Sequence, residues 1–112
     1  MNYKISGKVV RGDGYGKKLG FPTVNLETKQ QKTKEFPKDG VHAGVAVLDG
    51  REYRAGIVIG PKGKVEAHLI GYSGDAYGKE VTLQVGEFIR EYKKFNTEEE
   101  LIEQIGKDLE KC

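Results

Sequence analysis

The 112-residue sequence has few features that cross-link or anchor a chain, because it contains one cysteine, no tryptophan and three prolines. The single cysteine, Cys112, excludes a disulfide within the chain and indicates a reducing compartment. We expect this last residue to be a frayed, unreactive terminus. No apolar run approaches the ~20 residues of a membrane span, and the amino end lacks a signal-peptide core. The sequence therefore predicts a soluble, cytoplasmic protein without a membrane partner.

A strong charge of one sign is also lacking. Lysine and arginine total 19 against 17 acidic residues, so the net charge is only +2, and both signs are interspersed along the chain. Such a balance argues against a surface that follows nucleic-acid phosphates or a membrane. The length predicts one domain, residues 1–112, large enough for a hydrophobic core of its own.

Glycine, by contrast, is abundant, since sixteen residues are about twice the usual ~7% share. Many tight turns should follow, which favours an all-β fold. Apolar residues alternate in residues 1–11, 41–48, 51–59, 64–72 and 81–85, as in half-buried strands. In residues 41–48 the alternation predicts that Val41, Ala43, Val45 and Val47 share the apolar face. Asp49 and Gly50 form a favoured hairpin turn, and the change of phase after Gly86 predicts a bulge.

The carboxyl end has the signals of one helix. Thr97 and Glu100 have the spacing of a capping box, and Leu101, Ile102, Ile105 and Leu109 form an apolar stripe. We expect this helix to pack on the strands and close the barrel. The five alternating ranges and the extended residues 23–26 make six strand segments. Followed by one helix, they predict a small closed antiparallel barrel capped by the helix.

Residues 12–25 are the candidate site, since they contain four glycines, Lys17 and Lys18 directly after the first strand. Glycines let backbone N–H groups approach a phosphate, and a lysine adds charge. Thr23 and Asn25 point to one side of an extended segment and could hold a hard cation such as magnesium. The tract fits neither the P-loop nor the dinucleotide fingerprint. A glycine-rich turn with solvated lysines explains these residues equally well.

The pattern Gly-x-Gly-x-x-Leu-Gly-Phe-Pro-Thr-x-Asn-Leu at residues 14–26 resembles the signature of the ATP-dependent riboflavin kinases of bacteria and eukaryotes. Further matches follow in the same order at residues 40–41, 65–69, 75–79, 88–90 and 93–95, so the resemblance covers nearly the whole chain. It implies an all-β fold, a six-stranded antiparallel Greek-key barrel with a C-terminal helix. It also implies transfer of the ATP γ-phosphoryl group to the ribityl 5′-hydroxyl of riboflavin, giving FMN.

The resemblance implies a role for each matching residue. Glu66 would be the catalytic base, and Thr23 and Asn25 would bind the metal. The flavin would contact Arg90, Lys93 and Phe95. The nucleotide would contact Gly12, Gly14, Gly16, Lys17, Leu69, Gly71 and Tyr77.

Simpler explanations exist for several of these residues. Glu66 could belong to the polar outer face of a strand. Lys93 could be solvated, and Phe95 could only attach the helix to the barrel. For His68 we expect a structural hydrogen bond rather than a catalytic role.

The resemblance further implies Mg²⁺, with Zn²⁺ or Mn²⁺ as alternatives, and ATP as co-substrate. The expected partners are riboflavin and FMN, ATP and ADP, and a separate FAD synthetase, with a monomeric chain and no nucleic acid. Residues 1–112 contain no adenylyltransferase segment, so FAD synthesis is not expected from them. Three departures from the family pattern, the short loop 61–63, His42 and Glu91, predict altered loop closure or affinity.

Two other functions remain open from the sequence. A non-catalytic flavin or nucleotide sensor could use the same barrel but would not need Glu66. A small-barrel nucleic-acid binder would need a basic face with exposed aromatic side chains. Tyrosines are available for it, but the weak net charge argues against it.

Overall fold

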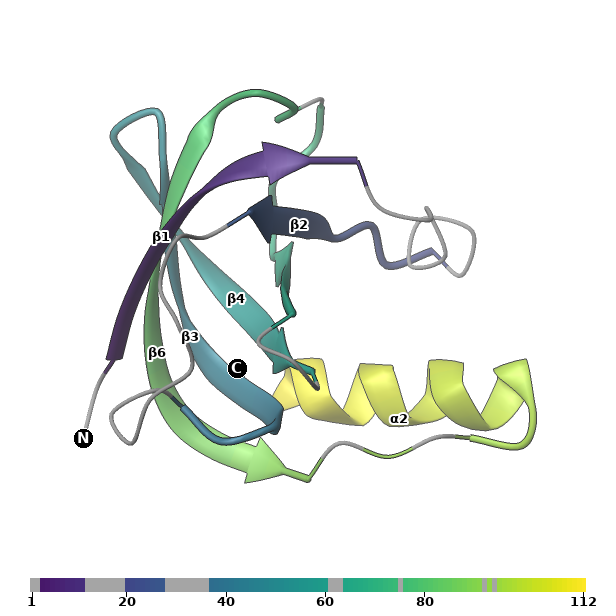
Figure 1. The fold of residues 1–112 in the computed structure, drawn as a ribbon. Coiled ribbons are helices and arrows are strands. Elements are labelled where there is room, and N and C mark those ends of the chain that lie inside the picture. Colours follow the sequence, from purple (N-terminus) through teal and green to yellow (C-terminus); the bar gives the residue numbers. More distant parts are fainter. Residues whose placement is uncertain are drawn as a thin grey trace.

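The computed structural model describes residues 3–11, 20–27, 37–60, 64–74, 76–91, 93 and 95–112. Six strands and one helix follow one another along the chain (Figure 1). They are β1 (Tyr3–Val10), β2 (Val24–Glu27), β3 (Gly40–Leu48), β4 (Arg51–Ile59), β5 (Val65–Leu69), β6 (Glu80–Arg90) and α2 (Glu98–Glu110).

The strands form a closed barrel in the order β1-β2-β5-β4-β3-β6, and every neighbouring pair is antiparallel. Strands β3, β4 and β5 follow one another directly, and β6 returns to lie beside β3, which is the Greek-key arrangement. The predicted all-β barrel with a C-terminal helix is therefore confirmed. Because the barrel is closed, each of the six described strands has a neighbouring strand on both sides.

The predicted turn and bulge are present. Asp49 and Gly50 have φ values of 51° and 76°, the left-handed conformation that a tight hairpin turn requires, and they join β3 to β4. The register of β6 against β3 shifts by one residue twice, first between the pairs Gly44–Val85 and His42–Phe88 and again between His42–Phe88 and Val41–Arg90. The first shift leaves an extra residue at Gly86–Glu87, where the bulge was predicted, and the second leaves Ile89 as the extra residue.

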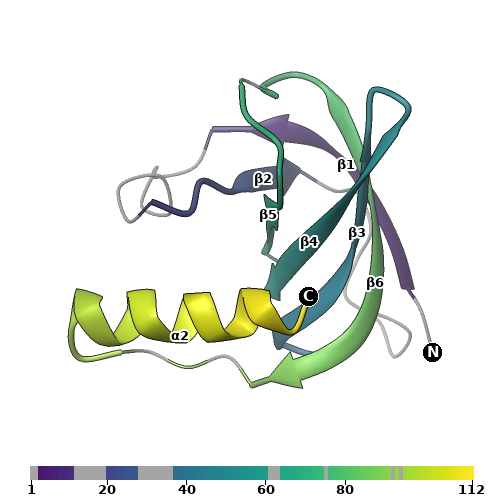
Figure 2. The ribbon, with the colours of Figure 1, turned by 180° about the vertical axis from the view of Figure 1, so that it is seen from behind.

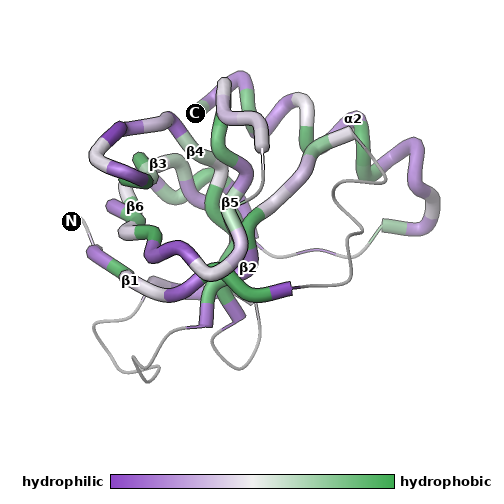
Figure 3. The backbone as a smooth tube through the Cα atoms, turned by 90° about the horizontal axis from the view of Figure 1, so that it is seen from above, coloured by the Kyte–Doolittle hydropathy of each residue, from purple (hydrophilic) through white to green (hydrophobic). Residues whose placement is uncertain are grey.

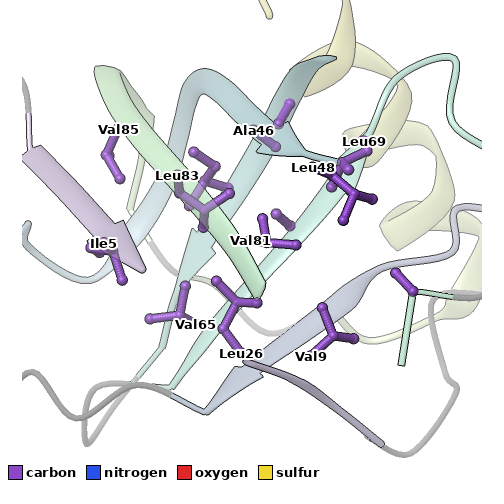
Figure 4. Packing of buried hydrophobic residues seen from close by; sticks show 14 of the residues in the cluster. Ile5, Val9, Leu26, Ala46, Leu48, Val65, Leu69, Val81, Leu83 and Val85 are labelled. Atoms are coloured by element: carbon purple, nitrogen blue, oxygen red, sulfur yellow. The ribbon is translucent and has the colours of Figure 1, made fainter. Parts of the chain in front are cut away.

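The barrel interior is filled by apolar side chains from every strand (Figure 4). Hydrophobic and hydrophilic residues alternate along the strands (Figure 3). The predicted inward faces of β1, β4, β5 and β6 are confirmed, with Ile5, Ile57, Val65 and Leu83 each at most 1% exposed.

The predicted face of β3 is wrong. Ala46 and Leu48 lie in the interior cluster, so the odd-numbered valines lie on the other side of the strand. The reason is space, because Gly44 is opposite Ala55 and faces inward with it. A Cβ on Gly44 would lie 2.7 Å from Cδ1 of Ile57 and would overlap the Gln84 carbonyl oxygen. At position 44 there is room for the hydrogen atom of glycine but not for a side chain.

Helix α2 begins at the predicted cap, where the Thr97 hydroxyl accepts a hydrogen bond of 3.2 Å from the Glu100 N–H. The expectation that α2 closes the barrel is wrong, because β1 closes it by pairing with both β2 and β6. The helix packs outside, with its last turn near β4, and its first turns extend away from the barrel (Figures 1 and 2). No helix within the described ranges combines the length and apolarity that a membrane crossing needs.

The end of the chain is packed rather than frayed, which corrects the expectation for Cys112. This residue is 7% exposed, and its thiol donates a hydrogen bond of 3.3 Å to the Asp108 carbonyl oxygen. Burial raises the pKa of the Cys112 thiol, so it stays protonated and unreactive near neutral pH. A Cβ on Gly56 would lie 2.9 Å from Leu109 and 3.6 Å from the Cys112 sulfur. The helix therefore rests on a strand position that has no side chain.

The close approach of β1 to β2 gives a stability prediction. A Cβ on Gly7 would lie 2.6 Å from the carbonyl oxygen of Glu27 and 3.3 Å from Cβ of Leu26. Because these are backbone or near-backbone atoms, the strands must separate to accept it. We expect Gly7→Ala to lower the free energy of unfolding by about 1–3 kcal/mol in a urea titration.

Gly106→Ala is the matched control. Gly106 lies inside α2, and a Cβ there meets no atom within 4 Å. Alanine favours the helix by about 0.5–1 kcal/mol over glycine, so this variant should be more stable than the wild type. Equal effects of the two substitutions would contradict the packing described for Gly7.

Candidate active site

The ladder between β2 and β5 brings together two of the predicted site residues. Asn25 is directly opposite Glu66, and their neighbours Leu26 and Val65 face the interior. Directly opposed residues point to the same side of a sheet, with Cβ atoms about 4.5–5.5 Å apart. The carboxamide of Asn25 and the carboxylate of Glu66 therefore lie side by side on the outer wall of the barrel.

The same row of opposed residues continues across the wall to Arg90. Glu66 is opposite Val58, Val58 is opposite Val41, and Val41 is opposite Arg90. Four inter-strand spacings of about 4.8 Å give roughly 19 Å along the curved wall. The predicted flavin-binding and phosphoryl-transfer ends thus lie on one row, and the two register shifts of β6 place Arg90 on that row.

The Glu66 side chain is partly covered, with 25% of its surface exposed. Its nearest cation among the described residues is Lys64, whose Nζ lies 3.8 Å from Oε1 and whose side chain is 63% exposed. A contact of this length between solvated groups contributes little to stability. The carboxylate is therefore held by its strand rather than by a strong ion pair, and its oxygens can accept a proton from a ligand.

A second row of outward-facing residues lies beside the first, two residues farther along β5 and closer to α2. His68 is opposite Gly56, the glycine on which the helix rests. Its Nδ1 lies 2.7 Å from the Pro22 carbonyl oxygen, which confirms the expected structural hydrogen bond. Pro22 directly precedes Thr23, so this contact places the Thr23 segment at the same end of the wall as Asn25 and Glu66.

The three predicted flavin-binding residues form one cluster. The Arg90 guanidinium and the Lys93 ammonium each lie 5.5 Å from the centroid of the Phe95 ring. Two cations against one aromatic ring make a surface that is both apolar and positively charged.

Asp108 is the residue of this cluster that sequence reasoning missed. It is 4% exposed and accepts from Arg90 Nε at 3.0 and 2.9 Å, from Arg90 Nη2 at 2.8 Å and from Gln104 Nε2 at 2.9 Å. A signal was present, because Asp108 occupies the position three residues after Ile105 within the apolar stripe. A charged residue on a buried helix face usually has a partner.

Most of the N–H groups of the Arg90 side chain are therefore already bonded within the protein. Besides Asp108, its Nη1 donates to the Glu91 carbonyl oxygen at 3.1 Å. A guanidinium has five N–H groups, so one on Nη1 and one on Nη2 remain for a ligand. Glu91, a departure from the family pattern, takes part through its backbone.

The predicted nucleotide-binding residues are only partly described. Tyr77 is 53% exposed, and the Arg11 guanidinium lies 5.2 Å from its ring centroid. Arg11 follows Val10, the β1 partner of Asn25, so Tyr77 lies near the Asn25 end of the wall. Gly71 is exposed, with φ of 86°, whereas the Leu69 side chain is in the core and could contribute only its backbone. Outside the described residues lie Gly12, Gly14, Gly16, Lys17 and the short loop 61–63.

The remaining departure from the family pattern, His42, is inside the barrel wall rather than at the site. It is 4% exposed, its Nε2 lies 2.9 Å from the Lys38 carbonyl oxygen, and its ring packs edge-on against Phe88 at 5.2 Å. It therefore supports the turn before β3.

The donor set suits a hard cation. The described residues contain no group of three His, Cys, Asp or Glu side chains that could hold a metal by themselves. Thr23 and Asn25 offer neutral oxygens beside the Glu66 carboxylate, and Mg²⁺ commonly combines few protein oxygens with substrate phosphates and water. The site fits a cation that arrives with a nucleotide.

Fold and site together define a closed Greek-key barrel with a polar ligand site on its outer wall, flanked by a C-terminal helix. The riboflavin kinase family, also called flavokinase, matches residues 1–112. The chain belongs to that family.

Individual relatives agree with this membership. A bifunctional riboflavin kinase/FMN adenylyltransferase of Escherichia coli K12 is 33% identical over 118 residues, which cover 95% of this chain and 36% of that protein. An RNA-binding riboflavin kinase of Bacillus subtilis is 33% identical over 114 residues, 94% of this chain and 47% of that protein. The chain thus spans about a third of the bifunctional relative and about half of the other.

Solved structures share the fold. A Streptococcus pneumoniae protein described as a macrolide-efflux protein has a TM-score of 0.86 at 28% identity, covering 96% of this chain and 37% of that one. Riboflavin kinase from Trypanosoma brucei has a TM-score of 0.72 at 24% identity, covering 97% and 73%.

The ion pair between β6 and α2 gives a second stability prediction. Asp108→Asn would leave Arg90 without a buried counter-charge, and breaking a buried pair costs about 3–5 kcal/mol. Because the Arg90 side chain keeps 22% exposure, we expect a smaller loss of about 2–3 kcal/mol in the free energy of unfolding, measured by urea titration.

Glu103→Gln provides the comparison on the same helix. It removes the Lys107–Glu103 pair of 3.3 Å, whose side chains are 62% and 70% exposed. An exposed pair at this spacing contributes about 0.5 kcal/mol or less. If both variants lost the same small amount, the Asp108 contact would not be a stabilising link.

Proposed function

We propose that this chain transfers the γ-phosphoryl group of ATP to the ribityl 5′-hydroxyl of riboflavin, forming FMN and ADP. The observation that carries the proposal is the direct opposition of Asn25 and Glu66 on the outer wall, at one end of the row that leads to Arg90. Family membership supports the substrate class, and the side-by-side position of Asn25 and Glu66 supports a base beside a cation site.

The Glu66 carboxylate acts as the base in this proposal. One of its oxygens accepts the proton of the 5′-hydroxyl, the hydroxyl oxygen forms a bond to the γ-phosphorus, and the bond from that phosphorus to the bridging oxygen of ADP breaks. Transfer of a phosphoryl group depends mainly on alignment and charge neutralisation. A strand holds Glu66 more rigidly than a loop would, which suits a group that must be placed within hydrogen-bond reach of the hydroxyl.

Thr23 and Asn25 would hold a divalent cation, with Mg²⁺ as the expected ion. When bound, the cation neutralises charge on the transferred group. Tyr77 and Gly71, together with the residues 12–17, would contact the nucleotide. Tyr77 supports this, because it packs against Arg11 directly after β1, near the Asn25 end of the row.

Riboflavin would lie along the wall toward α2. The isoalloxazine ring would contact Phe95, while Lys93 and the two remaining N–H groups of Arg90 would face its polar edge. The ribityl chain would then run along the row toward Glu66. Between the two ends, half-buried Val58 supplies an uncharged surface, whereas Val41 is buried.

Two further functions receive less support. A flavin sensor on this barrel would not need the Glu66–Asn25 pair. One relative is named as an RNA-binding riboflavin kinase, but that name describes a protein about twice as long as the matched segment. The interspersed charges and net charge of +2 do not favour a nucleic-acid partner here.

We further propose that residues 1–112 work as one domain, as a monomer in the cytoplasm, and that FMN passes to a separate FAD synthetase. The bifunctional relatives support the last step, because their names join a riboflavin kinase to an FMN adenylyltransferase in one protein.

The direct test of the function combines the wild type with Glu66→Gln. Incubation with riboflavin, ATP and Mg²⁺ should yield FMN and ADP in equal amounts by chromatography. Glu66→Gln keeps the shape of the side chain but removes the base, so turnover should fall by ~10²-fold or more while nucleotide binding is retained.

Glu52→Gln is the matched control, because Glu52 is an exposed carboxylate on β4 opposite Val47, away from the row. It should match the wild type. Full activity of the Glu66 variant would remove this residue from the mechanism, and absence of FMN from the wild type would contradict the proposed function itself.

The cation site gives a separate prediction. Asn25→Ala removes one oxygen donor, so we expect about a tenfold or greater increase in the Mg²⁺ concentration needed for half-maximal ATP binding, measured by calorimetry. Gln84→Ala removes an exposed carboxamide from β6 and should leave this concentration unchanged. An identical Mg²⁺ requirement in both variants would show that Asn25 does not bind the cation.

A further inference from the structure

His68 connects the two segments that form the phosphoryl-transfer end of the site. It lies on the outer wall two residues after Glu66, and its Nδ1 is 2.7 Å from the carbonyl oxygen of Pro22. A carbonyl oxygen only accepts hydrogen bonds, so Nδ1 must carry the proton. Which ring nitrogen donates is therefore fixed by the partner.

This bond acts where the backbone ladder has ended. The pairing of β2 with β5 runs from Leu26 to Val24, and Thr23 lies before its first residue. Pro22 has no N–H group, so it cannot donate a ladder bond of its own. The bond from His68 to Pro22 extends the attachment of this segment to β5 by two residues beyond Val24.

A second contact holds the same segment. The ring of Phe21 meets the His68 imidazole edge-on, with centroids 5.9 Å apart and planes at 83°. The imidazole thus contacts the two residues directly before Thr23 by one polar and one aromatic interaction. Thr23 is thereby fixed from the Pro22 side by His68 and from the Val24 side by the ladder.

We propose that His68 is a positioning residue of the phosphoryl-transfer site. Its Nδ1–H holds Thr23 in line with Asn25 and Glu66, so that the cation and nucleotide meet the base in one geometry. The inference rests on the proposed kinase function. A displacement near 1 Å of a group that aligns reactants can cost ~10²-fold in rate, so a loss of ~10- to 100-fold is expected without the bond.

Two substitutions of His68 test whether the hydrogen bond to Pro22 is needed or whether any polar side chain at this position is enough. Asparagine carries its N–H₂ group on Cγ, as histidine carries Nδ1, so His68→Asn can still donate to Pro22. Glutamine places its N–H₂ one bond farther out, at a position closer to Nε2. His68→Asn should keep turnover within about threefold of the wild type, and His68→Gln should lose ~10- to 100-fold.

The effect should be confined to the nucleotide end. In His68→Gln, Mg²⁺-dependent ATP binding measured by calorimetry should weaken about tenfold, and the KM for riboflavin should stay within about twofold. Long-range ¹H–¹⁵N spectra of the wild type should show the proton on Nδ1. Ser6→Ala is the matched control, since it removes a 2.9 Å hydrogen bond to Thr82 between β1 and β6 and should change none of these values.

Several results would overturn the inference. These are equal turnover and ATP binding in His68→Gln and the wild type, equal losses in the Asn and Gln variants, or a proton found on Nε2 alone. ATP binding keeps the test independent of turnover. A wild type that binds Mg²⁺ and ATP but makes no FMN would contradict the proposed function, and the Asn and Gln variants would still decide the role of His68 by their ATP binding.

Discussion

The pairing of β2 with β5 is the interaction on which the site depends. Strand β2 has only four residues, yet it fills the place between β1 and β5, and its register sets Asn25 against Glu66. A slip of one residue would turn Asn25 and Thr23 into the barrel and Leu26 out of it. The burial of Leu26 and Val9 opposes that slip, because both belong to the interior cluster. The hydrophobic core thus determines which side chains meet on the outer wall.

The opposite end of the wall depends on a different constraint. Two one-residue register shifts in β6 place Arg90 opposite Val41, and Asp108 then binds the guanidinium through two of its nitrogens. Because Asp108 lies in the last turns of α2, this ion pair joins the end of β6 to a helix that otherwise meets the barrel mainly at β4. The segment between them carries Lys93 and Phe95, so their position follows from the same link.

Much of this could be predicted from sequence, and the failures have physical causes. Alternation correctly gave the inward residues of four strands because the large apolar side chains of each lie mainly on one face. It failed for β3, where Val41, Val45 and Val47 are larger than the inward Gly44 and Ala46, and the tight space beside Ile57 decided the face. The capping residue Thr97 was found because its signal is local. The partner of Arg90 was missed because an ion pair between residues 18 positions apart leaves no periodic signal. The family signature gave Glu66, Thr23 and Asn25, whereas the strand register that joins them came only from the structure.

The row from Asn25 to Arg90 crosses five strands whose order in space differs from their order in sequence. The two ends of the row lie 65 positions apart in the sequence, and the contacts that align them are long-range. Folding of such a topology is slow compared with a helical bundle, because distant segments must meet before their contacts can form. A nascent chain would therefore gain its ligand site only when β6 has joined β3. Ligands that span the row would in turn bind the finished barrel alone and protect it from unfolding.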